Sequence, residues 1–465
     1  MRRGFSLEGK AVSNCKGKHI LYVCNYYAPD NTIAAIRSSK LVKHFKKLGY
    51  DVDVLTEKKD NMPVDDTLID DMEGINVFYV DNSDICKKIC KEYAKIIKPH
   101  KDKRMNRFDN RMRINKKTGS LEFNVFETMY PVIGSLDYIF AQIRQQNLAK
   151  RARKVVENEK KYDYVLTSYG DSFAYFYGMY FKKKHPDVKW IFDIRDAIYN
   201  YKTIAKYVKF IAKSYENKAW ESADLVVGVS HGICDTVSNK YKYKANYISN
   251  GFEYYKKLED KVADKETPMR FTYTGSMYGG IRDLSEFYRA VKELIDADRI
   301  DENKLEFVYA GNPSAFEIFK SQAAKYQLDE LCEYFGKVSR KEALQLQYDS
   351  DVLLLASFDY ADKTISALTG KVYEYMSIKR PVITIVVGDG CNSELTQIIN
   401  ETNIGISYEC TQKEEGFNRL KEYIAMQYER YINGCESFYN PVQEEVEKYN
   451  YANIVKRYIE LIEKL

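Results

Sequence analysis

Long apolar runs are absent from this 465-residue chain. A membrane-spanning helix needs about 20 consecutive apolar residues, and no segment approaches that length although 45% of the residues are hydrophobic. The first twenty residues are basic and lack the continuous apolar stretch of a secretory signal. We therefore expect a short flexible lead-in over 1–17 and a soluble protein of the cytoplasm.

Cysteine and histidine are too scattered to build a metal site or a disulfide framework. The nine cysteines are odd in number and contain no Cys-x2-Cys pair, and only five histidines occur. We expect reduced core thiols, with Cys86 and Cys90 one helical turn apart on a shared apolar face. Asp51 and Asp53 alternate along a strand without a loop that closes around a cation, so we expect no metal site there.

The overall charge is nearly balanced, at +5, and does not indicate binding to nucleic acid. One stretch is strongly basic: thirteen Lys or Arg and three acidic residues lie between Lys87 and Lys117, interleaved with apolar residues at helical spacing. The anionic surface of a membrane attracts such a stretch. A solvated surface insertion has the same pattern, so both alternatives stay open.

The length of the chain predicts two domains, because single cores stop growing near about 250–300 residues. The N-terminal half opens with an apolar strand over 18–24, a helical pattern over 33–48 and a strand over 50–56. Strand, helix and strand at this spacing form a βαβ unit in a parallel sheet. Further strands are predicted over 164–168, 189–193, 223–230 and 245–249.

The alternation of strands and helices stops in a charged, proline-containing stretch and then restarts. We expect an N-terminal Rossmann-like domain at 18–250, a basic insertion in it at about 84–130, a linker at 251–268 and a second Rossmann-like domain at 269–442. The fold class is α/β, with two doubly wound domains facing each other across a cleft. The segment 443–465 is predicted to be one amphipathic helix with Val446, Tyr449, Ile454, Tyr458, Ile459 and Ile462 on its apolar side.

Neither half contains a GxGxxG turn, which argues against a nicotinamide or flavin dehydrogenase. The best candidate for a phosphate site is 274–283, where a strand ends in a glycine-rich loop that delivers Arg282 just before a helix. Glycines allow close backbone approach, and a guanidinium can bind a diphosphate with two prongs. A plain turn with a surface arginine is the alternative. The loop residues of interest are Gly275, Ser276, Gly279 and Gly280.

A second loop has related chemistry. Thr369, Gly370 and Lys371 open a predicted helix that also carries Glu374. Residues three apart share one helix face, here near the positive end of the helix dipole. This arrangement suits a phosphate beside Lys371, with Glu374 accepting hydrogen bonds from ribose hydroxyls. A capped helix with an ion pair between the two side chains is the alternative.

In the N-terminal half, Asp193 and Asp196 follow a strand at its carboxyl end. Their carboxylates could orient an acceptor or donor sugar, or they could be salt-bridged residues that buttress a loop. Ser230 and His231 follow another strand, and there the capping of a turn is the favoured interpretation.

Several segments together resemble the GT-B glycosyltransferases, specifically the family 4-like group of bacterial surface-polysaccharide synthesis. The resemblance covers nearly the whole chain. Besides 19–56 it is carried by WIFDIRD at 190–196, ESADLVVGVSHGICDTV at 221–237, ISNGFE at 248–253, FTYTGSMYGGIRDLS at 271–285, FGKVSRKEALQLQYDSDVLLLAS at 335–357 and TGKVYEYMSIKRPVI at 369–383.

The resemblance implies roles for the donor site. Arg282 and Lys371 would neutralise the donor diphosphate, and Glu374 would hold the ribose. The turn formed by Gly336, Lys337 and Val338 would lie beside the base.

The resemblance also extends to the N-terminal half and has two departures. The loop from Ala28 to Arg37 corresponds to the family's loop beneath the diphosphate, with Ala34 and Ala35 in place of the usual paired glycines. The glutamate that commonly touches the donor sugar is replaced by Ser366. The candidates to substitute for it are Asp362, Lys363 and Thr364.

The implied activity is transfer of a sugar from a nucleotide-diphosphate sugar to a saccharide or lipid-linked saccharide, with retention of configuration. No metal and no further cofactor are expected, because Arg282, Lys371 and helix dipoles would offset the leaving-group charge. The catalytic candidates are Arg282, Lys371, Asp193 and Asp196. A nucleotide-sugar epimerase or phosphorylase, and a non-catalytic sugar-binding protein, are the alternatives. The expected location is the cytoplasm, and association with the inner face of the membrane through the basic stretch is the alternative.

Overall fold

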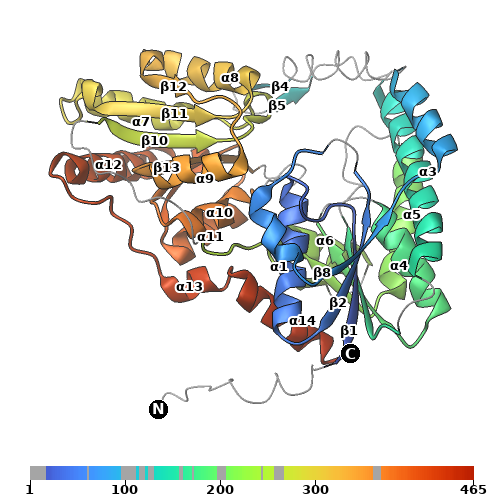
Figure 1. Ribbon diagram of the computed structural model, residues 1–465. Coiled ribbons are helices and arrows are strands. Elements are labelled where there is room, and N and C mark those ends of the chain that lie inside the picture. Colours follow the sequence, from blue (N-terminus) through green and yellow to red (C-terminus); the bar gives the residue numbers. More distant parts are fainter. Residues whose placement is uncertain are drawn as a thin grey trace. The chain divides into compact units, whose positions relative to one another are not determined.

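The computed structural model describes residues 17–59, 62–95, 112–114, 121–123, 130–156, 161–169, 172–195, 206–241, 245–255, 267–359 and 368–465. The chain divides into two compact units. Unit 1 comprises 1–103, 125–250 and 451–465, and unit 2 comprises 104–124 and 251–450. Each unit is built around one parallel sheet (Figure 1).

Unit 1 contains a seven-stranded sheet in the order β3-β2-β1-β6-β7-β8-β9. Neighbouring strands pair in parallel, so every connection is a crossover. The strands are β1 (His19–Cys24), β2 (Asp51–Glu57), β3 (Asn76–Val80), β6 (Tyr164–Tyr169), β7 (Lys189–Ile194), β8 (Leu225–Gly228) and β9 (Ala245–Tyr247). The helices are α1 (Ile33–Lys47), α3 (Tyr130–Val156), α4 (Ser172–Lys184), α5 (Lys206–Ser222), α6 (His231–Tyr241) and α14 (Tyr451–Ile462), with a 3-10 helix η2 (Asp66–Met72).

Both ends of helix α1 are set by residues that favour helix termination, Thr32 before the helix and Gly49 after it. The side chain of Thr32 accepts a hydrogen bond from the Ala35 amide at 3.0 Å, which caps the first turn. Gly49 follows the helix with a φ of +94°, a conformation that favours glycine. The predicted βαβ unit is therefore confirmed. Helices α1 and α14 pack on one face of the sheet, and α3, α4 and α5 contribute to the core on the other (Figure 1).

Unit 2 contains a six-stranded parallel sheet in the order β12-β11-β10-β13-β14-β15. Its strands are β10 (Met269–Thr274), β11 (Leu305–Ala310), β12 (Cys332–Tyr334), β13 (Val352–Phe358), β14 (Val382–Val387) and β15 (Gly405–Glu409). Its helices are α7 (Ser285–Asp296), α8 (Pro313–Ala324), α9 (Arg340–Tyr348), α10 (Lys371–Ile378), α11 (Glu394–Thr402), α12 (Lys413–Ile432) and α13 (Gln443–Glu447). The sequence did not lead us to expect β15, α11 or α12.

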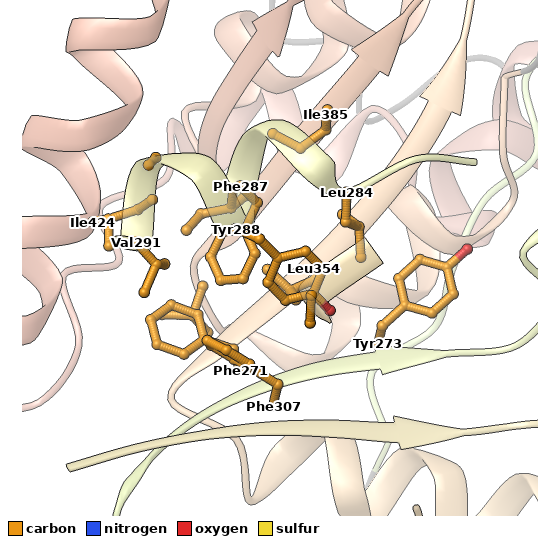
Figure 2. Close-up of a cluster of buried hydrophobic side chains, with 14 of the residues drawn as sticks. Phe271, Tyr273, Leu284, Phe287, Tyr288, Val291, Phe307, Leu354, Ile385 and Ile424 are labelled. Carbon is orange, nitrogen blue, oxygen red and sulfur yellow. The ribbon is translucent and has the colours of Figure 1, made fainter. Parts of the chain in front are cut away.

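Aromatic side chains fill much of the core of unit 2. Phe287 and Tyr288 of α7 pack edge to face against Phe307 of β11, with ring centroids 5.6 and 5.3 Å apart. Figure 2 shows this cluster beneath the helix, together with Phe271 and Leu354 from β10 and β13. Such contacts stabilise a core beyond the burial of apolar area alone. The cluster fixes α7 on the sheet directly after the loop that delivers Arg282.

The C-terminal segment corrects one of our expectations, because 443–465 is not a single helix. Helix α13 ends at Glu447, and the backbone of Asn450 pairs with Phe252 in an isolated parallel bridge before α14 begins at Tyr451. Val446 belongs to a core cluster of unit 2, whereas Ile454 belongs to a core cluster of unit 1. The apolar stripe therefore serves two cores.

The expected domain limits shift for the same reason. Phe252 is buried in unit 2, and its amide donates to the Tyr449 carbonyl at 3.0 Å, so the second unit begins at Gly251 rather than 269. Of the basic insertion, the structure describes a helix over 84–95 and two short antiparallel strands, β4 (Met112–Ile114) and β5 (Leu121–Phe123). The predicted lead-in over 1–17 and the rest of the insertion lie almost entirely outside the described residues.

The division of the apolar stripe can be tested with two substitutions. Ile454→Ala should destabilise unit 1 by about 2–5 kcal/mol, since it opens a cavity in that core, and should lower amide-exchange protection in β1. Val446→Ala should lower protection in β14 instead. Exposed Glu460→Ala in α14 serves as the control. Loss of protection in the same unit from both changes would contradict the assignment.

Candidate functional site

The candidate site lies in unit 2 at the carboxyl ends of β10 and β13. These strands are neighbours, and the chain leaves β10 toward β11 on one side and returns to β13 on the other. Loops at such a reversal point diverge and leave a crevice, where ligands of open α/β sheets bind. The loop after β10 and the beginning of α10 both belong to this region of the sheet.

The loop after β10 needs its glycines for conformational reasons. Gly275, Gly279 and Gly280 have φ values of +99°, +64° and +91°. Side chains other than glycine rarely adopt this region. At Gly275 a second constraint applies, because a Cβ atom there would collide with the Lys371 ammonium group. Glycine therefore lets the lysine lie directly against the backbone of the loop.

The turn at Gly336 is joined to the same loop by backbone hydrogen bonds. The Gly275 amide donates to the Ala310 carbonyl at 2.7 Å, and the Gly311 amide donates to the Gly336 carbonyl at 2.9 Å. Gly336 has a φ of +78°, and a Cβ atom there would meet nothing within 4 Å. Lys337 is exposed, and Val338 packs beside a small apolar cluster.

Arg282 lies inside the loop rather than on the surface, and the residue is 6% exposed. Its Nη1 donates to the Ser276 carbonyl at 3.1 Å, and its guanidinium carbon lies 4.3 Å from the centroid of the Tyr278 ring. Its buried Nε has no hydrogen-bond partner among the described residues. A buried donor without an acceptor is costly, so this Nε is suited to donate to a ligand.

Lys371 opens α10, where the Thr369 hydroxyl accepts from its amide at 3.4 Å. Burial, together with the nearby charges of Arg282 and Arg340, lowers the pKa of the Lys371 side chain to about 8, while Glu374 acts in the opposite direction. The structure thus brings Arg282, Lys371 and Glu374 together, as we expected. Gly370, before the helix, has a φ of −61°, which any residue can adopt.

Glu374 is not the partner of Lys371, because its ion pair is made with Arg340. Nη1 of Arg340 lies 2.9 Å from Glu374 Oε2, and Nε2 of Gln347 donates to Glu374 Oε1 at 2.8 Å. Burial alone would raise the pKa of Glu374, but Arg340 and the Gln347 hydrogen bond hold it below its ordinary value. The carboxylate is therefore ionised at neutral pH.

Arg340 and Gln347 were not among the predicted site residues. One local signal was present: Ser339 and Glu342 form a capping box that makes Arg340 the first residue of α9. Gln347 is fully buried and also donates to the Thr274 hydroxyl at 2.9 Å. Neither contact follows from sequence spacing, because the partners come from different elements.

The electrostatic balance of the site is positive. Among the described residues, three cationic side chains, those of Arg282, Lys371 and Arg340, influence one another around the carboxylate of Glu374. Buried charges are stable only when they are paired. A bound anion would supply negative charge, and the positive end of the α10 dipole favours the same ligand.

In unit 1, Arg37 and Asp193 form a buried salt bridge, which corrects their expected roles. Arg37 Nε and Nη2 lie 3.1 and 3.2 Å from the two oxygens of Asp193, and both residues are at most 1% exposed. Arg37 also donates to the Ser249 carbonyl and to the Tyr458 hydroxyl. Asp193 is therefore a salt-bridged residue that supports the fold, the second of the two alternatives given for it.

The remaining candidate residues of unit 1 that the structure describes lie in a helix or cap a turn. Ala34 and Ala35 lie in the first turn of α1 rather than in a loop, since the helix begins at Ile33. The Ser230 hydroxyl accepts from the Ile233 amide at 3.2 Å, as turn capping requires. Outside the described residues lie Asp196, Asp362, Lys363, Thr364 and Ser366.

Within the described ranges, no group of three or more His, Cys, Asp or Glu residues is suitably placed for a metal ion. Asp53 accepts from the Tyr162 hydroxyl at 2.8 Å. The described cysteines are free thiols.

Known proteins share this architecture. Residues 268–413 match the family model described as Glycosyl transferases group 1. The chain resembles solved structures of a sucrose-phosphate synthase from Thermosynechococcus elongatus (13% identity, 96% of this chain and 98% of the other, TM-score 0.54) and a lipopolysaccharide outer core galactosyltransferase (12%, 96% and 100%, 0.54). The catalytic domain of starch synthase IV from Arabidopsis thaliana is similar as well (11%, 97% and 99%, 0.55). The fold is GT-B.

The GT-B assignment confirms the predicted fold class. The family match covers the loop after β10, α9 and α10, which carry the cationic cluster. No curated protein matches the sequence significantly.

The contact between Gly275 and Lys371 gives a matched pair of substitutions. Gly275→Ala should weaken binding of inorganic pyrophosphate by about tenfold or more, because the new methyl group displaces the ammonium. Gly336→Ala carries a similar backbone strain at positive φ but enters open space, so it should change this affinity by less than about threefold. Isothermal titration calorimetry measures both. Equal losses would show that strain, not Lys371, sets the affinity.

Proposed function

We propose that the protein transfers a sugar from a nucleotide-diphosphate sugar to a saccharide or lipid-linked saccharide acceptor. The observation that carries this proposal is the cluster of cationic side chains at Gly275, in which the buried Arg282 retains a donor without an acceptor among the described residues. A diphosphate would supply both the negative charge and the oxygen atoms. The starch synthase that this chain resembles is bound to ADP, which is a nucleoside diphosphate.

The chemistry proposed for this site is electrostatic. When the sugar–phosphate bond breaks, negative charge develops on the departing nucleoside diphosphate. Arg282 and Lys371 would stabilise that charge, and the amides at the start of α10 would add to it. Glu374, held ionised by Arg340, would accept hydrogen bonds from the ribose and so keep the diphosphate beside the two cations.

The proposal also covers the class of sugar, the stereochemistry of the transfer and the need for a metal. We expect a hexosyl transfer with retention of configuration and without a metal, as the resemblance to the family 4-like group implies. On the acceptor side, Asp196 stays a prediction, whereas Asp193 is occupied by Arg37. Release of nucleotide only after acceptor is added would distinguish transfer from epimerisation.

The proposal predicts a large effect at Arg282. Among a panel of nucleotide sugars, at least one should raise the melting temperature of the protein and serve as donor. Arg282→Ala should then cost about 2–4 kcal/mol of transition-state stabilisation, as the loss of one preorganised charge contact does. The measurement is kcat/KM for that donor.

Arg299→Ala is the matched control, since Arg299 is a surface residue of the same unit that pairs with Glu422. It should leave kcat/KM unchanged. Near-normal turnover of Arg282→Ala would contradict the role of Arg282. A panel in which no nucleotide sugar stabilises the protein would contradict the proposed donor class.

We also propose that unit 1 touches an anionic membrane surface when the acceptor is lipid-linked. On the helix over 84–95, Ile85 and Ile89 are 74% and 51% exposed, and the exposed Lys88 and Lys91 lie beside them. Apolar and cationic side chains on one exposed helix favour adsorption to anionic lipid. Among the described residues, no helix combines the length and the apolar character that a membrane crossing needs.

Vesicle sedimentation tests this surface. The protein should sediment with vesicles of phosphatidylglycerol more than with vesicles of phosphatidylcholine, and Ile85→Ser with Ile89→Ser should reduce the bound fraction. Exposed Ile432→Ser in unit 2 is the control. Equal sedimentation of all variants would contradict a role for this helix.

A further inference from the structure

Arg340 links two parts of unit 2 that are far apart in the sequence. We propose that Arg340 is a positioning residue that fixes the carboxylate of Glu374 for the ribose of a nucleoside diphosphate, and that Tyr255 holds Arg340 in place. This inference rests on the proposed function of the site and concerns its specificity for ribose. Neither residue was expected from the sequence to take part in the site.

The two contacts of Arg340 diverge from one guanidinium group. Nη1 lies 2.9 Å from Glu374 Oε2, and Nη2 donates to the Tyr255 hydroxyl at 2.7 Å. The side chain is 15% exposed. The planar fork of arginine fixes the angle between its donors, so binding at Tyr255 also sets the orientation at Glu374.

The carboxylate of Glu374 is held from both sides but is not saturated. Oε2 receives Arg340, and Oε1 receives Gln347, which is itself anchored to the Thr274 hydroxyl. An ionised carboxylate has about four lone-pair sites, and these two contacts occupy two of them. The remaining acceptor capacity suits a pair of hydroxyl groups, such as those of a ribose.

Arg340 differs from Arg282 in what its donors already contact. Both terminal nitrogens of Arg340 have protein partners, a carboxylate and a phenol. Arg282, by contrast, donates to the Ser276 carbonyl and forms no ion pair with a carboxylate among the described residues. The two arginines therefore have different tasks. Arg282 is able to bind an anion, whereas Arg340 orients the carboxylate of Glu374.

Tyr255 occupies a fixed part of the chain, the segment 251–255 through which the chain enters unit 2. Phe252 of this segment is buried and bonds to the Tyr449 carbonyl, and the Tyr254 hydroxyl donates to Glu447 at 2.7 Å. The segment is thus tied to α13 on one side and to Arg340 on the other. Because Arg340 contacts both residues, a displacement of Tyr255 would change the position of the Glu374 carboxylate.

The test compares nucleotides with and without ribose hydroxyls. The tightest binder among UDP, GDP, CDP and ADP is identified by calorimetry, and its affinity is compared with that of its 2′,3′-dideoxy analogue. Wild-type protein should prefer the ribonucleotide by about tenfold or more, since hydrogen bonds to a charged group are strong. Arg340→Met should remove most of this preference and change the affinity for the dideoxy analogue by less than about threefold.

Three further variants complete the experiment. Tyr255→Phe should reduce the preference partly, Arg340→Lys should restore some of it, and exposed Lys341→Met should leave it unchanged. If Arg340→Met does not fold, the Tyr255→Phe and Arg340→Lys variants decide the question by the same ratio. Thermal unfolding is recorded for each variant, because a merely structural role would lower stability without changing the preference for ribose.

The outcomes separate the inference from the proposed function. Equal losses of affinity for both nucleotides in Arg340→Met would overturn the positioning role, because they would indicate a general contribution of charge. A wild-type protein that binds nucleoside diphosphates without preferring ribose would overturn it as well. Wild-type protein that binds none of the four nucleotides would instead contradict the proposed function itself.

Discussion

An excess of positive charge among the described residues around Gly275 is the feature on which the rest of unit 2 depends. Gly275 has no side chain and a left-handed backbone, so Lys371 lies against the loop after β10. Arg282 is held nearby by the Ser276 carbonyl. Charges that are removed from water without partners are costly. A bound anion is the simplest group that would lower the electrostatic free energy of these cationic side chains.

Unit 1 contains the opposite arrangement, and the contrast helps to separate function from structure. Arg37 and Asp193 are both buried, yet they neutralise each other with two short contacts. Arg37 also joins the end of the strand region at Ser249 to Tyr458 of α14. The charges of this pair neutralise each other, and both side chains are shielded from solvent. Asp193 was a candidate sugar-binding residue because it lies at the end of a strand, but its contacts with Arg37 stabilise the fold.

The sequence predicted the parts of the fold and the site that depend on local pattern. The alternation of strands and helices indicated both sheets, and the glycines before Arg282 indicated a loop with unusual backbone angles. Lys371 and Glu374 were identified because they lie three residues apart at a helix start. Arg340 was missed because its partners come from separate elements, α10 and the segment 251–255. The break before Tyr451 was missed because one apolar stripe continues across two cores.

The central claim is that an anion completes the cationic site, and the ionisation of Lys371 reports on it most directly. A lysine is charged below its pKa, so the free protein should lose this charge as the pH rises through about 8. A bound nucleoside diphosphate should stabilise the charged form and move the transition to higher pH. Nuclear magnetic resonance of the labelled Lys371 side chain, with and without nucleotide, measures this. A transition near 10.5, the ordinary value, that nucleotide does not move would contradict the account.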